Sequence, residues 1–213
     1  MTIEVRTAPA FEPVSLAEAR LWLRIDSDDT AQDSVITMLI AAMRRYAENY
    51  TGRAFVSRAL RLTLGDWPYH AKWGVLIELP SPPLISVDAF KYTDTDGVLQ
   101  TLASTQYVVH EWRAPAWIVP AYSGGIPVTW PTIRLVPDSL QIDFTAGYTE
   151  GAGSPTEQAE AAENVPDSLK LWMHARIATL YEQREQLIVG TIVAQVPWNF
   201  ADGMLDELRT GIF

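Results

Sequence analysis

Hydrophobic residues recur at helical spacing over residues 15–53, which is the clearest pattern in the chain. They lie three or four residues apart and so form one face of a long helix. That face comprises Val35, Ile36, Leu39, Ile40, Met43, Tyr46, Ala47 and Tyr50. Polar residues at Thr37, Arg44, Arg45 and Glu48 fall mostly on the other face. The pattern predicts an amphipathic helix that buries one side.

Boundary residues divide this region into two helices. Ser15 and Glu18 have capping-box spacing, in which each side chain accepts a hydrogen bond from the backbone of the other. Asp28 or Asp29 is suited to cap the second helix. Gly52 is suited to end it, because glycine adopts the left-handed conformation without a steric penalty.

The middle of the chain has the alternating pattern of β-strands. Apolar and polar residues alternate in Leu60–Leu64 and in Ser139–Phe144. Asp94–Gly97 has the composition of a tight turn between strands. Prolines at 80, 82 and 83 exclude a helix there. Antiparallel strands are therefore predicted from about residue 54 to residue 148.

Helical signals return in the last third, after a loop predicted at Glu150–Pro155. Pro166 is suited to the first turn of a helix that ends near Gln186. This helix has an apolar stripe of Leu169, Trp172, Met173, Ile177 and Leu180, interrupted by Arg176. A last short helix is expected around Met204 to Arg209.

The order of these elements predicts an α+β fold. Helices that cannot bury their apolar faces alone are expected to pack together as a small bundle, with two N-terminal helices and one or two C-terminal ones. An antiparallel β domain is inserted between them. The expected boundaries are 1–53 and 150–213 for the helical domain and 54–149 for the β domain.

Composition narrows the classes of function. The 213 residues include 16 Lys and Arg against 26 Asp and Glu, and a net charge of −10 argues against tight, general binding to nucleic acid. With no cysteine, disulfides and thiolate metal sites are excluded. The longest apolar runs, such as Met38–Met43, are too short to span a bilayer, and the N-terminus lacks a signal-peptide pattern. We expect a cytoplasmic protein without a membrane segment.

No motif for catalysis is present. Nucleophile elbows, phosphate-binding glycine loops and His-Glu-x-x-His are all missing from the sequence. His70, His110 and His174 are far apart, whereas metal ligands usually converge from short spacings. Asp94 and Asp96 resemble the start of a calcium loop, but Thr105 stands where the loop needs Glu. We therefore predict no enzyme activity, no catalytic residue, no metal and no cofactor.

Tryptophan is abundant, with 8 residues. Five fall in the predicted β domain, at Trp67, Trp73, Trp112, Trp117 and Trp130. Three interpretations stay open: packing inside the domain, aromatic anchors at a subunit interface, and a platform that stacks on sugars.

Several short motifs follow one another along the chain. They are Ser15–Asp26 with the later Glu48–Arg53, then Ile77–Val87, Tyr92–Gly97, Ala146–Tyr148, Val165–Pro166 and Tyr181–Glu185. Their order resembles the head–tail connector (adaptor) proteins of long-tailed phages and gene transfer agents. The resemblance covers most of the chain and is weaker over 111–135 and the last ~20 residues.

This resemblance implies a structural role in the neck of a phage-like particle made in a bacterial cytoplasm. The expected assembly is a homo-oligomeric ring of about twelve copies, which lies below the portal protein and above a tail-side stopper or tail-terminator protein. Double-stranded DNA would pass through without specific binding. The alternative is a β-rich carbohydrate-binding module with helical flanks, which would need exposed coplanar tryptophans and a monomeric state.

Two sets of residues are candidates for these contacts. Arg44, Arg45 and Arg53 are candidates for the subunit interface, because arginines on the second helix could pair with acidic residues of the next copy. The apolar C-terminal segment is a candidate for portal binding, because chain ends are usually polar unless they are tied down. Its residues are Trp198, Phe200, Met204, Leu205, Leu208, Ile212 and Phe213. The same segment could instead fold back onto its own bundle.

Overall fold

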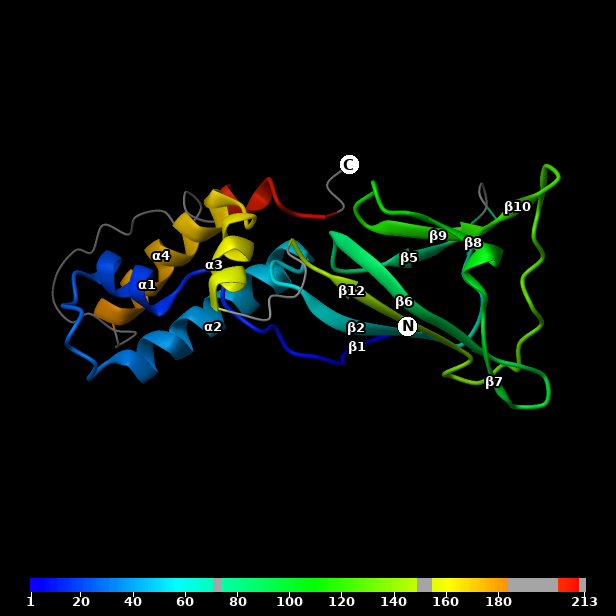
Figure 1. Ribbon diagram of the computed structural model, residues 1–213, viewed down its shortest axis with the longest axis horizontal. Coiled ribbons are helices and arrows are strands. Elements are labelled where there is room, and N and C mark those ends of the chain that lie inside the picture. The colour runs from blue at the N-terminus through cyan, green and yellow to red at the C-terminus, as the bar shows by residue number, and fades with distance from the viewer. Residues whose placement is uncertain (71–73, 149–154, 184–202, 211–213) are drawn as a thin grey trace, which may run out of the picture. The chain divides into compact units, whose positions relative to one another are not determined.

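The computed structural model divides into two compact units. A β unit comprises Met1–Ala10 and Ser57–Gly151, and a helical unit comprises Phe11–Val56 and Ala152–Phe213 (Figure 1). The structure describes residues 1–70, 74–148, 155–183 and 203–210. Helices and antiparallel sheets occupy different parts of the chain, which confirms the α+β class.

The main sheet of the β unit has five antiparallel strands in the order β1-β2-β12-β6-β7. These strands are β1 (Thr2–Val5), β2 (Arg58–Leu64), β12 (Leu140–Ala146), β6 (Leu84–Thr93) and β7 (Leu99–Thr101). Burial alternates along the central strands β2 and β12, as their sequences predict, so one face of the sheet is a core and the other is more open. The β6–β7 hairpin turns at Asp94–Gly97, where Gly97 has a φ of 87°.

Smaller sheets complete the β unit. A three-stranded antiparallel sheet has the order β5-β9-β8, and two short hairpins pair β3 with β4 and β10 with β11. Their bounds are β3 (Tyr69–His70), β4 (Gly74–Val75), β5 (Ile77–Leu79), β8 (Tyr107–His110), β9 (Ala116–Pro120), β10 (Tyr122–Ser123) and β11 (Ile126–Pro127). A 3₁₀ turn, η1 (Ser104–Gln106), precedes β8.

The N-terminal segment differs from its sequence prediction. We expected residues 1–53 to lie in the helical domain, but Thr2–Val5 is an edge strand paired with β2. Backbone pairing with Leu60–Thr63 places the first ten residues in the β unit. Four residues are too few for a period-two pattern to predict a strand.

Four helices form most of the described helical unit. They are α1 (Leu16–Leu23), α2 (Asp33–Thr51), α3 (Pro155–Glu163) and α4 (Asp167–Glu182). The predicted capping box of Ser15 and Glu18 begins α1, and Gly52 ends α2 with a φ of 71°. Gln32, rather than Asp28 or Asp29, occupies the N-cap of α2. Helix α3 was not predicted, and the preceding loop residues 149–154 lie outside the described part.

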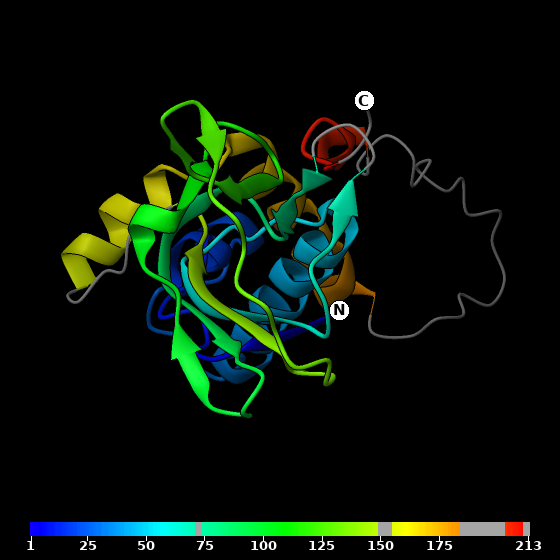
Figure 2. The ribbon, with the colours of Figure 1, turned by 90° about the vertical axis from the view of Figure 1, so that its right-hand side faces the viewer.

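Helices α1, α2 and α4 pack against one another, as the sequence predicts. Buried side chains from α2 and α4 fill the space between them: Ile36, Ile40, Ala47, Leu169, Trp172, Met173 and Ile177. Helix α3, drawn in yellow, extends sideways from α2 and α4 in Figure 2. Its C-terminal end is held by the buried residues Ala161 and Val165.

The buried face of α2 is rotated from the predicted one. Arg44 and Glu48, expected on the open face, are 6% and 4% exposed, whereas Tyr46, expected inside, is 50% exposed. Residues from outside the helix cause this rotation, because they supply partners for the two buried charges.

Candidate interaction surfaces

A buried ion network joins three segments of the helical unit. The Arg44 guanidinium donates from Nε to Glu12 Oε2 at 2.6 Å, from Nη2 to Glu12 Oε1 at 3.1 Å, and from Nη1 to Glu48 Oε2 at 2.8 Å. Glu48 Oε1 accepts the backbone N–H of Phe55 at 3.2 Å. Burial lowers the pKa of Arg44, but the hydrogen bonds and charges of the two glutamates outweigh it and raise that pKa. The network therefore fixes the segments before α1 and after α2.

The three candidate interface arginines differ in exposure and in their partners. Arg44 is buried among partners of its own chain. Arg53 is half-buried and donates from Nε to the backbone carbonyl of Leu208. Arg45 is exposed. The lateral interface stays a prediction, with Arg45 as its surface candidate.

Three of the candidate portal-binding residues lie in a segment that docks on the end of α2. Leu205 is 0% exposed, and Met204 and Leu208 are half-buried. The Tyr50 hydroxyl lies 2.7 Å from Asp206 Oδ1, and the Thr210 N–H donates to the carbonyl of Thr51 at 2.9 Å. This part of the segment folds back onto its own unit. Trp198, Phe200, Ile212 and Phe213 lie outside the described residues.

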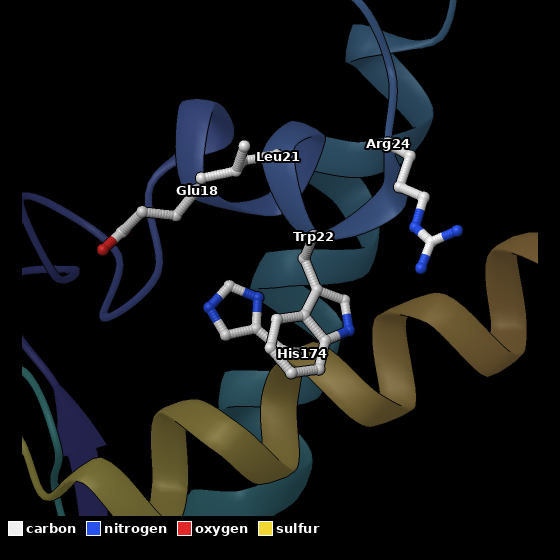
Figure 3. A pocket seen from close by; sticks show the side chains of 5 residues that line it. All are labelled: Glu18, Leu21, Trp22, Arg24 and His174. Carbon is white, nitrogen blue, oxygen red and sulfur yellow. The ribbon is translucent and has the colours of Figure 1, made fainter.

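A hollow of about 410 Å³ opens on the surface of α1 and α4 (Figure 3). It is lined by Glu18, Leu21, Trp22, Arg24 and His174. The Trp22 and His174 rings stack with centroids 5.0 Å apart, as the close-up shows. Leu21 is 80% exposed and Trp22 is 47% exposed, so α1 leaves an apolar surface uncovered.

The charges around this hollow are only partly paired. Burial raises the pKa of Glu18, but hydrogen bonds from the Ser15 N–H and hydroxyl outweigh it, so that pKa is lowered. Burial is also the main reason that the pKa of His174 is lowered. The buried His174 Nδ1 has no hydrogen-bond partner within the described residues. Arg24, which has a left-handed φ of 58°, directs its side chain toward α4 in Figure 3.

The hollow was not predicted from the sequence. One feature of α1 could have indicated an exposed apolar surface. Ala19 is buried, whereas the large apolar residues Leu21 and Trp22 lie off that buried face. Their apolar character alone could not show that α4 brings His174 beside them.

The described tryptophans of the β unit stack on one another or line a hollow, and Trp73 lies outside the described residues. Trp67 and Trp130 stack with centroids 4.6 Å apart, and Trp67 Nε1 donates to the carbonyl of Pro131 at 3.2 Å. Trp112 is 76% exposed and lines a hollow of about 720 Å³ together with Trp117 and Trp130. The Arg113 guanidinium lies 3.5 Å from the Trp117 ring centroid and partly covers it. Among the described tryptophans of the β unit, Trp112 alone is exposed, and Trp67, Trp117 and Trp130 are half-buried.

The described residues form no metal site and no membrane-spanning helix. No group of His, Asp and Glu in the described ranges could hold a metal ion. No described helix is long and apolar enough to cross a membrane.

Comparison with known proteins gives one family and several structures. Residues 13–75 match the family described as Phage gp6-like head-tail connector protein. A chain from the "Neck of empty GTA particle computed with C6 symmetry" is 24% identical, with a TM-score of 0.73. Chains from the "Virion of native gene transfer agent (GTA) particle" and the "Neck of native GTA particle computed with C12 symmetry" are 23% and 25% identical, with TM-scores of 0.72 and 0.64. Each alignment covers 100% of this chain and 97% of the other.

No curated protein matches the chain. The expected resemblance is nevertheless confirmed: the protein is similar to head–tail connectors over residues 13–75, and over its whole length it shares the fold of chains found in gene transfer agent particles.

Proposed function

We propose that this protein is a structural connector in the neck of a phage-like particle, where it joins the head to the tail. The observation that carries the proposal is the connector-family match over residues 13–75, a range that contains α1 and α2. The fold shared with neck chains of gene transfer agent particles supports it. The role is one of assembly, without a catalytic step.

The proposed assembly is a homo-oligomeric ring. The similar chains come from necks computed with C6 and C12 symmetry, which supports a ring of about twelve copies for this chain. Arg45, exposed on α2, is proposed to pair with acidic residues of the adjacent copy. Exposed ion pairs contribute only about 0–1 kcal/mol each, so apolar burial must provide most of the ring's stability.

The proposed partners above and below the ring are a portal protein and a stopper or tail-terminator protein. We propose that Trp198, Phe200, Ile212 and Phe213 form the portal contact, because the described Leu205 is already buried in its own unit. Burying each large apolar side chain contributes about 1.5–3 kcal/mol. A ring would repeat that contribution in every copy.

The acidic composition suits a channel for DNA. A net charge of −10 on each copy would weaken adhesion of the DNA backbone to the ring, because like charges repel. The duplex is therefore proposed to pass without sequence-specific contacts.

Mass measurement in solution and imaging of particles test this proposal. We expect the purified protein, alone or with the portal protein, to form a closed ring, and particles assembled without it to lack attached tails. A stable monomer that neither binds the portal nor affects tail attachment would contradict the connector role. A sugar-dependent shift in melting temperature of such a monomer would favour the carbohydrate-binding alternative.

A double variant tests the portal contact. W198A/F200A should retain the wild-type circular dichroism spectrum and lose portal binding. W112A, which removes an exposed tryptophan from the β unit, is the control and should bind normally. Wild-type affinity in W198A/F200A would place the portal contact elsewhere.

A further inference from the structure

The hollow on α1 and α4 has the chemistry of a docking site for an acidic segment. Its exposed apolar surface comes from Leu21 and Trp22. Arg24 makes no side-chain hydrogen bond or ion pair within the described part of the chain, and Lys170 lies close enough to influence the pKa of His174. The one acidic side chain lining the hollow, Glu18, is already held by Ser15. An occupant with carboxylates beside small apolar groups would complement this surface.

Helix α3 of the same chain has that chemistry. Glu157, Glu160 and Glu163 are exposed and lie on one side of the helix at a spacing of three residues. Glu160 and Glu163 have no ion-pair partner among the described residues. Figure 2 shows the ribbon of α3 extending away from α2 and α4, and the three glutamates are exposed, so this side of the helix is accessible to another molecule.

We infer that α3 of one copy docks in the α1–α4 hollow of the next copy. This inference rests on the proposed ring and names two surfaces that would form part of its lateral contact, in addition to Arg45. A ring needs a head-to-tail contact between two different, complementary patches of the same chain. The hollow offers Arg24 and an open apolar surface, and α3 offers Glu160 and Glu163. Charge complementarity between them would set the register of neighbouring copies.

Charge reversal on each side provides the test. Full-length R24E and E160R/E163R should each fold, because all three residues are exposed. Each variant alone should need at least about tenfold more protein than wild type to form rings, because like charges then face each other at every contact. Circular dichroism verifies folding, and mass photometry measures the rings.

Mixing the two variants makes the test specific. In an equimolar mixture, an alternating ring brings unchanged α3 to an unchanged hollow and reversed α3 to a reversed hollow. Rings should therefore return near the wild-type concentration. E111R/D138R, which reverses two exposed charges of the β unit, is the matched control: alone it should form rings at the wild-type concentration, and mixed with R24E it should not draw R24E into those rings near that concentration.

The possible outcomes separate this inference from the function it rests on. Normal assembly of E160R/E163R alone, or a complementary mixture that stays unassembled while both variants are folded, would overturn the α3 contact and leave the ring standing. Failure of the wild-type protein to form a ring, alone or with portal, would overturn the connector proposal and this contact with it.

Discussion

The two units place their main ion pairs in different environments. In the helical unit, Arg44 and Glu48 have side chains only 7% and 3% exposed. In the β unit, Arg61 and Asp143 pair across neighbouring strands at 2.6 Å with side chains 20% and 22% exposed. A buried charge that loses its partner is far more costly than one that water can reach. Similar-looking salt bridges can therefore have unequal roles, and we expect the helical unit to depend more strongly on its pair than the β unit does.

Removing the buried arginine should have the largest effect. We expect Arg44→Ala to lower the free energy of unfolding by about 3–5 kcal/mol, because Glu48 is left buried without its cation. Urea unfolding followed by circular dichroism measures the change. Arg45→Ala, one residue along and exposed, is the control and should change stability by no more than about 0.5 kcal/mol. Equal losses in the two variants would contradict the burial argument.

Loss of the capping box should have an intermediate effect. Ser15→Ala removes the hydroxyl that accepts the Glu18 N–H at 3.2 Å, so we expect a loss of about 1 kcal/mol. Ser27→Ala, in the exposed loop after α1, provides the comparison and should be nearly neutral. Thermal unfolding of the two variants side by side measures the difference.

Breaking the partly exposed pair of the β unit should have a small effect. Arg61→Ala should cost about 0.2–1 kcal/mol, since water can solvate Asp143 once the arginine is gone. The same urea experiment as for Arg44 gives a direct comparison. A loss of several kcal/mol here would remove the contrast between the units.

The smallest effect concerns pH. The hydrogen bond from Arg61 holds the pKa of Asp143 below its usual value, so the unfolded chain takes up the proton at a higher pH than the folded one. This contribution is fully present above the ordinary aspartate pKa of about 4 and is lost as the pH falls through the folded value. Asp143→Asn should therefore flatten the acid side of the stability curve. An unchanged slope would show that the pair does not couple to folding.

Local signals predicted much of this fold. Features that depend on residues close in sequence were predicted correctly. They are the capping box of Ser15 and Glu18, the helix end at Gly52, and the alternating burial of β2 and β12. The face of α2 was misassigned because Glu12, the partner of Arg44, lies 32 residues away. Hydrophobic periodicity assigns an arginine to the exposed face of a helix, because the sequence does not show which distant residue will pair with it. The α1–α4 hollow was missed for the same reason, since it depends on a contact between distant segments, whereas β1 was too short to give a pattern.

The final contact of α2 has a consequence for the timing of folding. The Thr51 carbonyl is bonded by Thr210, 159 residues later, so the end of α2 is completed only after that part of the chain has been made. At about 5–20 residues per second, the delay during synthesis is about 8–32 s. The strands of the main sheet are all present once Ala146 has emerged. We therefore expect the β unit to be able to fold while the helical unit still awaits its last segment, which leaves the C-terminal end of α2 without its Thr210 contact during that interval.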